Sequence, residues 1–355
     1  MIDILFIAQN RHQFEYFTKL SKNLEFNCKV VMPKYFCYSF KKCNIDKKLD
    51  EVERKYSSFK ALLYKQYIKL ITPYFECNYK NYINKFNPKI VALWNGVKYP
   101  QNIAVSIAKE FNKKILYFEN GFLPNTTQAD CKGVNADSSI PRDYEFYKNL
   151  TIDTKLPKEL NKRAFVGKQK LYDVELPESY IFVPFQVAYD SQIINFSNFS
   201  GMEELFYLIA KIANNLKINF VFKEHPSDRV SDYSKLHNIA NESPYLTFAN
   251  SVDTQELIQN AKAVVTINSS VGIESLLFSK KVYVLGKAFY AIDGITIKAN
   301  KNTLEQKLQD KQEIDFKVVE NFLKYLQSYL LPNSWKEPNK EHYLALNKRI
   351  KQCLQ

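Results

Sequence analysis

The feature that most constrains this chain is the alternation of short apolar runs with longer amphipathic stretches, which begins at residue 3 and continues to about residue 285. Runs rich in β-branched and aromatic residues are typical of buried strands, and the stretches between them repeat apolar residues at helical spacing. Strands that alternate with helices form a mostly parallel sheet with helices on its faces. The sequence therefore predicts an α/β fold.

The alternation falls into two sets, separated by a polar segment at 150–178. The first set predicts strands at 3–9, 28–32, 89–94 and 114–118, helices at 12–24 and 101–112, and an inserted helical stretch at 47–86. The second set predicts strands at 181–185, 218–222, 246–248, 263–267 and 281–285, and helices at 201–216, 231–241, 254–261 and 271–279. Asp253 and Glu256 have the spacing of a capping box that opens one of these helices.

We therefore predict two Rossmann-like domains, at 1–160 and 161–300. Ligands of such sheets bind outside the carboxyl ends of the strands, so a cleft between the two domains is the expected site. The final stretch, 301–355, reads as C-terminal helices, for which a return onto the first domain is one arrangement.

Charge narrows the class of partner. The chain has 50 Lys and Arg against 37 Asp and Glu, a net charge of +13, which favours nucleic acid, anionic lipid or a phosphorylated and carboxylated substrate. The basic residues are spread along the chain without Arg-rich runs, aromatic RNA-binding motifs or Cys/His fingers. A nucleic-acid partner is therefore not expected.

The sequence contains neither a basic leader nor an apolar run of the roughly 20 residues that a membrane span needs, so we expect a cytoplasmic location. The Lys-, Tyr- and Leu-rich stretch 47–86 leaves open a peripheral association with the anionic inner membrane. Six cysteines lie at irregular distances without a C-x-x-C pair, so we expect reduced thiols and neither a disulfide framework nor a zinc site.

The strongest local signal lies between residues 118 and 142. A predicted strand ends on Glu119, a turn at Gly121 follows, and a second carboxylate, Asp130, arrives in another polar segment. Loop ends of this kind carry the reactive groups of α/β enzymes. Ordinary turn chemistry explains the same composition, because Asn, Asp, Gly and Ser are common loop residues.

Several blocks together resemble a known family. They read Glu119-Asn-Gly-Phe, Asp130-Cys-Lys-Gly-Val-Asn135, Ser138-Ser139 and Pro141-Arg142, followed by Pro184-Phe-Gln186, Lys223-Glu-His-Pro226 and Asn268-Ser-Ser-Val-Gly-Ile-Glu274. This pattern is similar to that of the retaining β-Kdo transferases of bacterial capsule and lipopolysaccharide synthesis, where Kdo is 3-deoxy-D-manno-oct-2-ulosonic acid. The resemblance covers roughly residues 90–290 and implies a GT-B fold, CMP-β-Kdo as donor and retention of the β anomer.

The resemblance also implies roles for the two carboxylates. A retaining mechanism needs either a carboxylate nucleophile or a front-face route in which the protein stays non-covalent. Asp130 would be the nucleophile on C2 of Kdo, in a double displacement, and Glu119 the acid/base that activates the acceptor hydroxyl. Asp137 lies in the same loop and stays open as an alternative nucleophile. A nucleoside monophosphate leaves with less charge than a diphosphate, so a cation, an imidazole and a helix dipole are expected to replace a metal ion.

In the second half, Lys223, His225 and Pro226 close a predicted strand, where a cation and an imidazole suit a phosphate, although a tight Pro turn explains the same residues. Asn268, Ser269 and Ser270 precede a helix and are expected to aim free backbone N–H groups at an anion, although Ser is also simply a good cap. The other nucleotide-directed candidates are Gln186 and Glu274. The candidates for contact with Kdo or the acceptor are Asn95, Asn120, Gly121, Asn135, Ser138, Arg142, Asp190 and Gln192.

Two rival interpretations stay open from the sequence. Transferases that use CMP-sialic acid or CDP-polyols also combine a His-Pro turn with a Ser-rich helix start, and a donor panel separates them from a CMP-Kdo enzyme. A non-catalytic glycan-binding relative would keep the fold without turnover, and the pair Glu119 and Asp130 argues against it. The expected partners are CMP-Kdo and a glycan or lipid-linked acceptor, and the sequence does not identify which acceptor.

Overall fold

The computed structural model describes residues 2–34, 37–38, 45–56, 58–161, 173–187, 191–310 and 312–355, without the side chains of residues 47, 54, 55, 191 and 192. The chain divides into two compact units. Unit 1 comprises Met1–Gly121, Asn125–Ser139 and Leu330–Gln355, and unit 2 comprises Phe122–Pro124 and Ile140–Tyr329. The positions 160 and 300, at which domain boundaries were predicted, both lie inside unit 2.

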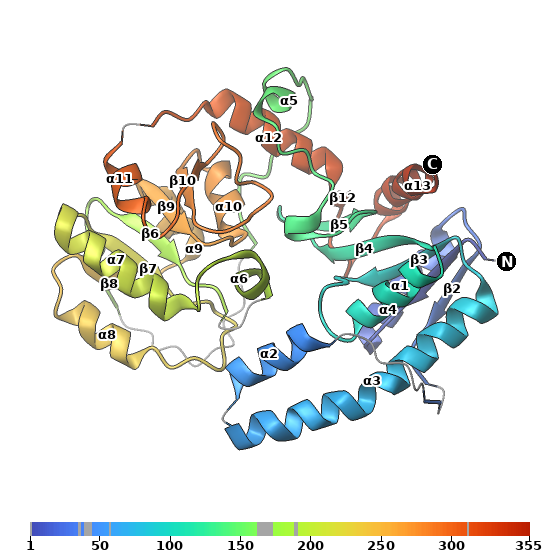
Figure 1. Ribbon diagram of the computed structural model, residues 1–355. Helices are drawn as coiled ribbons and strands as arrows, with labels where there is room; N and C mark the ends of the chain where they lie inside the picture. Colours follow the sequence, from blue (N-terminus) through green and yellow to red (C-terminus); the bar gives the residue numbers. More distant parts are fainter. Residues whose placement is uncertain are drawn as a thin grey trace. The chain divides into compact units, whose positions relative to one another are not determined.

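Unit 1 is built on a six-stranded sheet with the order β12-β5-β4-β3-β1-β2 (Figure 1). The strands are β1 (Ile4–Ile7), β2 (Cys28–Val31), β3 (Ile90–Trp94), β4 (Lys114–Asn120), β5 (Thr126–Asp130) and β12 (Leu331–Pro332). The first four run parallel, and β5 and β12 are antiparallel to their neighbours. The four parallel strands are those that the apolar runs predicted.

Helices cover both faces of this sheet. They are α1 (Arg11–Asn23), α3 (Ser58–Phe86), α4 (Gln101–Glu110) and α13 (Lys340–Leu354), and α2 (Asp46–Lys55) packs on the first half of α3. Apolar residues of α1 and α13 pack on one face, and those of α4 and the second half of α3 pack on the other. The residues from Leu330 to the end of the chain thus complete the core of unit 1.

The two antiparallel strands were not predicted. Every residue of β5 is buried, although Thr126, Thr127, Gln128 and Asp130 are polar. β12 pairs with Thr126 and Thr127, and the loop that follows β5 binds the side chains of Gln128 and Asp130. An apolar pattern cannot indicate a strand whose polar side chains are buried by such contacts.

Unit 2 contains a fully parallel six-stranded sheet with the order β11-β10-β9-β6-β7-β8. Its strands are β6 (Ile181–Pro184), β7 (Phe220–Lys223), β8 (Leu246–Phe248), β9 (Ala263–Thr266), β10 (Lys281–Val284) and β11 (Ile297–Lys298). Counted from β6, this is the order 3-2-1-4-5-6 of a doubly wound Rossmann sheet. The strand order reverses between β6 and β9.

The helices of unit 2 are α5 (Tyr144–Lys148), α6 (Ser191–Phe196), α7 (Met202–Leu216), α8 (Ser234–Asn241), α9 (Thr254–Asn260), α10 (Val271–Leu277), α11 (Leu304–Gln309) and α12 (Phe316–Tyr329). Asp253 caps α9, because its carboxylate accepts the N–H of Gln255 at 2.8 Å. The predicted α/β class, with two Rossmann-like sheets and C-terminal helices, is confirmed.

The expectation that the cysteines remain reduced thiols is wrong for four of them in this structure. Cys37 pairs with Cys77 and Cys131 with Cys353 as disulfides, with Cα atoms 5.9 and 5.8 Å apart. Such distances suit a disulfide, and only the fold brings these residues together, since 40 and 222 positions separate the partners. Cys28 is free, and burial raises the pKa of its thiol to about 12.

Within the described ranges, the helices are all too short or too polar to cross a bilayer.

Candidate active site

In unit 1, the carboxylate of Glu119 lies at the end of β4 and is held by four N–H donors. Oε1 accepts from Trp94 Nε1 at 3.2 Å and from the backbone and side-chain nitrogens of Asn120 at 3.0 and 3.2 Å. Oε2 accepts from Asn95 Nδ2 at 2.6 Å. The structure therefore brings together three residues that the sequence named, Glu119, Asn95 and Asn120.

The side chain of Asn95 is itself held by the backbone of the turn that follows β3. It follows β3 with φ +61°, a left-handed conformation that Asn tolerates better than most residues. Its Oδ1 accepts from the N–H groups of Val97 and Lys98 at 3.1 and 3.0 Å, so its Nδ2 is left to donate to Glu119. The orientation of the Glu119 carboxylate is thus set by a turn at the end of the neighbouring strand.

Two residues of this cluster were missed from the sequence. Trp335, from the segment after β12, donates to Asn120 Oδ1 at 2.9 Å and packs edge-on against Trp94 with ring centroids 5.2 Å apart. Gln128, in β5, donates to the Asn120 carbonyl at 2.6 Å and bonds Asn135 through both side-chain atoms, at 3.4 and 3.2 Å. No local motif marks either residue, because only the added strands β5 and β12 bring them to the cluster.

The pairing of β4 with β5 places both predicted catalytic carboxylates on one face of the sheet. Glu119 lies opposite Gln128, and Tyr117 lies opposite Asp130. Residues two apart on a strand share a face, so Glu119 and Asp130 are diagonal neighbours, about 7–8 Å apart in backbone position. The ten residues between them in sequence close a β-hairpin.

The turn of this hairpin depends on Gly121. A Cβ atom at this position would lie 1.9 Å from Thr126 Oγ1 and 2.5 Å from the backbone carbon of the same residue. The Gly121 N–H also donates to the Thr126 carbonyl at 3.0 Å. The Glu-Asn-Gly-Phe block therefore has a steric reason for its glycine, independent of any ligand.

Asp130 anchors the loop that follows it. Oδ1 accepts from the N–H groups of Lys132 and Gly133 at 2.6 and 3.3 Å, and Oδ2 accepts from the N–H and hydroxyl of Ser139 at 2.6 and 2.9 Å. The residue is 1% exposed. In this conformation its carboxylate fixes both ends of the Gly-Val-Asn to Ser-Ser loop.

Other predicted residues lie along the same loop. Asn135 has φ +55° and joins Gln128. Ser138 is buried, and its hydroxyl has no hydrogen-bond partner among the described residues. Asp137 is exposed, and Arg142 is exposed in the adjoining part of unit 2.

In unit 2, Gln186 and Asn268 meet where the strand order reverses. Gln186 follows β6, Asn268 follows β9, and the Gln186 side chain donates to Asn268 Oδ1 at 3.0 Å while accepting its N–H at 3.2 Å. This reversal is the position at which open α/β sheets bind ligands. Both residues were predicted to lie in the nucleotide site.

The expected free N–H groups at the start of α10 are not present, and that expectation is wrong. The N–H of Val271 donates to Ser269 Oγ, that of Gly272 to the Ser269 carbonyl, and those of Ile273 and Glu274 to the Ser270 carbonyl. Ser269 thus acts as a cap, and the first turn of the helix satisfies its own donors. The hydroxyl of Ser270, at the exposed N-cap, makes no capping bond.

In the Lys223-Glu-His-Pro226 block, Lys223 and His225 bind backbone groups of nearby loops. The ammonium of Lys223 donates to the carbonyls of Asn250 and Val252, and burial lowers its pKa. His225 Nδ1 accepts from the N–H of Ser227 at 3.1 Å, which leaves the neutral ring its proton on Nε2. Pro226 is buried in this turn.

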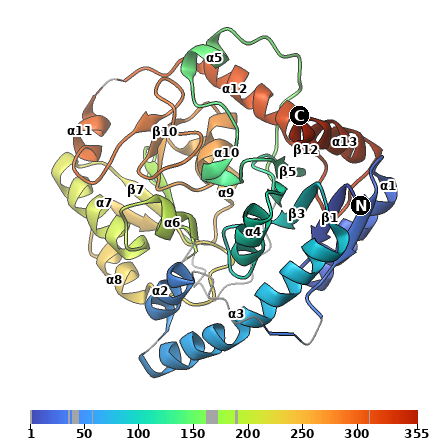
Figure 2. The same cartoon turned by 45° about the vertical axis from the view of Figure 1, so that its right-hand side comes forward.

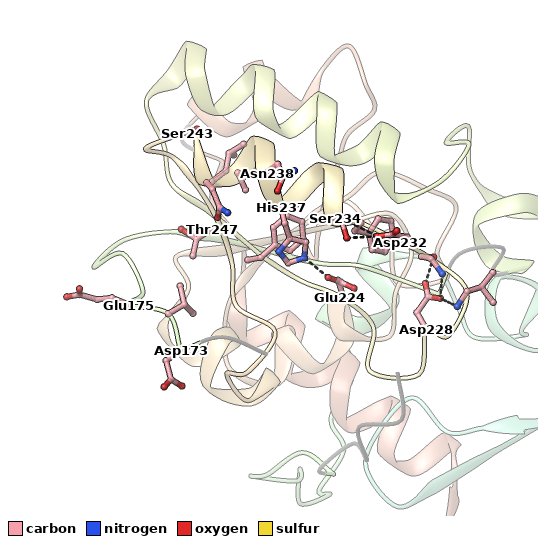
Figure 3. Close-up of a pocket in the computed structure, with 18 of the residues that line it drawn as sticks. Asp173, Glu175, Glu224, Asp228, Asp232, Ser234, His237, Asn238, Ser243 and Thr247 are labelled. Carbon is pink, nitrogen blue, oxygen red and sulfur yellow. Dashed lines mark hydrogen bonds and ion pairs between the residues drawn. The ribbon is translucent and has the colours of Figure 1, made fainter. Parts of the chain in front are cut away.

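Glu224, which stands in the same block, forms a pair that the sequence did not predict. Its Oε1 accepts from Asn250 Nδ2 at 2.9 Å and lies 2.6 Å from Nε2 of His237, in α8 (Figure 3). The His237 ring stacks on Phe248 with centroids 4.0 Å apart. Glu224, His237 and Phe248 line a pocket of about 810 Å³ that also carries Asp228, Ser231, Asp232, Ser234, Asn238 and Thr247. Polar groups set into a pocket of this size are typical of a ligand site.

Two predicted contacts cannot be placed. Asp190 lies outside the described residues, and so does the side chain of Gln192. Among the side chains that are described, no group of three or more His, Cys, Asp or Glu is arranged to hold a metal ion. The expectation of a metal-free site stays a prediction.

Comparison with known proteins gives a family for part of the chain. A model of the family "Capsule polysaccharide biosynthesis protein" matches residues 166–331. Protein FixF of Sinorhizobium fredii (strain NBRC 101917 / NGR234) is 35% identical over 273 residues, which cover 75% of this chain and 65% of FixF. The chain therefore spans just under two thirds of that relative. The capsule polysaccharide export protein KpsS of Escherichia coli is 28% identical over 62% of this chain and 72% of KpsS.

A solved structure, the β-Kdo 2,7 transferase of Thermosulfurimonas dismutans KpsC, superposes with a TM-score of 0.50 at 14% identity and covers 90% of this chain and 89% of that chain. At this identity the likeness concerns the fold, which is the GT-B type that the sequence predicted. The family model that matches residues 166–331 confirms the resemblance to the capsule polysaccharide biosynthesis group for that part of the chain.

Proposed function

We propose that this chain is a retaining glycosyltransferase that moves β-Kdo from CMP-Kdo to a bacterial surface glycan or glycolipid. The observation that carries the proposal is the hairpin of β4 and β5, which sets Glu119 and Asp130 on one face of the sheet. These are the carboxylates to which the family resemblance assigns the chemistry. The family match and the GT-B fold support the same activity.

Retention follows from two displacements at C2 of Kdo. In the first, a carboxylate oxygen of Asp130 forms a bond to C2, the bond from C2 to the phosphate oxygen breaks, and CMP leaves with the electron pair. In the second, the acceptor oxygen attacks C2, the bond to Asp130 breaks, and Glu119 takes the proton of the acceptor hydroxyl. Each displacement inverts C2, so the product keeps the anomer of the donor.

The two carboxylates are prepared for these roles to different degrees. Glu119 is only partly buried, and four donors fix its direction. Asp130 is 1% exposed, and the donors that face its oxygens come from Lys132, Gly133 and Ser139. Attack on C2 therefore requires that at least one of these contacts opens when the donor binds.

For the nucleotide we propose the carboxyl ends of β6, β7 and β9 in unit 2. Gln186 and Asn268 lie at the strand-order reversal, and His225 lies in the turn after β7, where an imidazole suits a phosphate oxygen. Ser270 adds an exposed hydroxyl. No metal ion is part of this proposal.

The test is CMP release from CMP-Kdo, CMP-sialic acid and CDP-glycerol by the full chain, in the presence of a Kdo-terminated glycolipid acceptor. We expect release from CMP-Kdo alone. Glu119→Gln should lower the rate about 100- to 10,000-fold, because it removes the base that takes the acceptor proton. The matched control, Glu15→Gln, changes an exposed carboxylate of unit 1 that pairs with Arg11 and should leave the rate unchanged.

The nucleophile is tested by intact mass rather than by rate alone. Glu119→Gln incubated with CMP-Kdo and no acceptor should accumulate a mass increment of one Kdo residue, located on Asp130 by peptide mapping. An increment on Asp137 would move the nucleophile within the loop. CMP-Kdo binding without release from wild type would contradict the transferase proposal and favour a non-catalytic glycan-binding relative, and release from CMP-sialic acid or CDP-glycerol would replace the donor.

A further inference from the structure

The first half of α3 carries an apolar face that nothing in the described chain covers. Six of the large apolar side chains exposed to solvent fall between residues 59 and 70, with exposed fractions from 41% to 73%. They are Phe59, Leu62, Leu63, Tyr64, Tyr67 and Leu70. Contiguous exposure of this kind marks an interaction surface, whereas scattered exposed apolar residues do not.

Five of these residues form a continuous stripe. Phe59, Leu62, Leu63, Tyr67 and Leu70 are spaced three or four residues apart, so they lie on one side of the helix over a length of about 16 Å. We call these five residues the α3 stripe. Ala61 and Ile68, which are buried against Val52 of α2, project from the opposite side. The helix is therefore apolar on two faces, of which the fold uses only one.

The two halves of α3 differ in how much of the fold surrounds them. The second half of α3 packs into the core of unit 1 through Tyr79, Tyr82 and Ile83. The first half contacts α2 and Tyr99 and extends beyond the sheet of unit 1 in both views (Figures 1 and 2). A projecting two-helix element with an exposed apolar face needs a partner outside unit 1.

The charges around the stripe indicate what that partner is. Residues 58–75 contain three lysines and no acidic residue. Lys65 is paired with Glu53 of α2 at 2.7 Å, whereas Lys60 and Lys69 are exposed and flank the stripe on its two sides. The acidic residues of α2 lie on the far side of α3, because α2 packs on the face opposite the stripe.

We infer that the α3 stripe docks on an anionic lipid surface, with Lys60 and Lys69 at the level of the headgroups. An interfacial helix of this kind buries its apolar residues at the boundary of headgroups and acyl chains while lysines reach back to the phosphates. A second copy of the chain fits less well, since it would bring four like charges together. This inference does not rest on the proposed function, because it concerns where the protein binds and not what it transfers.

The test is flotation of the full chain with vesicles of phosphatidylcholine alone and of phosphatidylcholine mixed with phosphatidylglycerol. Wild type should bind the anionic vesicles, bind neutral ones much more weakly, and lose the difference at high salt. Phe59→Ser combined with Leu63→Ser and Leu70→Ser should lower the partition coefficient by at least about 100-fold. Lys60→Gln with Lys69→Gln should lower it about 30-fold, or roughly 5-fold per lysine.

Matched controls come from elsewhere in the chain. Leu344→Ser removes another exposed leucine of unit 1, and Lys211→Gln with Lys348→Gln removes two exposed lysines. Both control variants should bind vesicles within about twofold of wild type. Equal binding to neutral and anionic vesicles would overturn the inference. A wild-type dimer that the triple serine variant converts to monomer, or a loss of thermal stability in that variant, would also overturn it and assign the stripe to a protein contact.

Discussion

Glu119 of unit 1 is held mainly by the side chains of its neighbours, whereas Lys223 of unit 2 holds the backbone of an adjacent loop. Glu119 is oriented by the side chains of Trp94 and Asn95, in a position that remains partly exposed. Lys223 instead donates to the carbonyls of two residues in the loop after β8. A motif residue can serve to bind a substrate or to stabilise the fold. The hydrogen-bond partners of its side chain and its exposure distinguish these two roles.

The largest expected effect tests Asp130, which resembles Lys223 in that it binds backbone groups of a loop. Asp130→Asn replaces an acceptor that faces four donors, so at least one donor would face an amide N–H₂. We expect a loss of about 3 kcal/mol in the free energy of unfolding of unit 1. Both tryptophans of the chain, Trp94 and Trp335, lie in unit 1, so urea unfolding followed by tryptophan fluorescence reports on this unit.

The control for Asp130→Asn is Asp137→Asn, which makes the same chemical change at an exposed position of the same loop. It should shift the free energy of unfolding by no more than about 0.5 kcal/mol. Equal effects of the two variants would show that the buried hydrogen bonds of Asp130 do not hold the loop.

A smaller effect is expected in unit 2. Lys223→Met leaves the carbonyls of Asn250 and Val252 without their donor, which should cost about 2 kcal/mol and speed hydrogen exchange in residues 249–252. CMP affinity is measured in parallel with the exposed control Lys262→Met. Unchanged hydrogen exchange together with weaker CMP binding would show that Lys223 binds the nucleotide and does not stabilise the loop.

Gly272 tests the packing behind the Ser269-Ser270 turn. A Cβ atom there would lie 2.6 Å from the hydroxyl oxygen of Tyr290, a fully buried ring whose hydroxyl donates to the Ser269 carbonyl. We expect Gly272→Ala to cost about 1–2 kcal/mol, measured by thermal unfolding in far-UV circular dichroism. Gly201→Ala is the control, because a Cβ at Gly201 meets nothing within 4 Å.

The smallest effect is a pH dependence confined to unit 1. Burial lowers the pKa of His342, whose Nδ1–H donates to the Pro332 carbonyl while Nε2 accepts from the Tyr16 hydroxyl, each at 2.8 Å. The folded state binds fewer protons than the unfolded one, so stability falls as the pH drops through 6.5 and stops falling below the folded pKa.

The slope contributed by His342 is at most about 1.4 kcal/mol per pH unit. Tryptophan fluorescence in urea between about pH 7 and pH 5 measures it. His342→Gln should abolish this slope, and His12→Gln, on the exposed face of α1, should keep it. A slope that survives His342→Gln would assign the pH dependence to other groups.

The sequence predicted those parts of the fold that have an apolar signature. The nine strands that it named are all present, because each lies in a run rich in apolar residues. The polar strand β5 and the two-residue strands β11 and β12 have no such signature and were missed. The site divides in the same way. Glu119, Asn95 and Asn120 were named and do meet, whereas Trp335 and His237 join their clusters only through contacts distant in sequence.

The return of residues 330–355 to unit 1 has a consequence for synthesis on the ribosome. β12 pairs with β5, and Cys353 lies beside Cys131, so the sheet and one core of unit 1 are completed by a segment that is translated after unit 2. Almost all of unit 2 is one continuous stretch of chain that emerges earlier. Unit 2 can therefore finish folding while the nascent unit 1 still exposes the edge of β5, and chaperone binding during translation should concentrate on that edge.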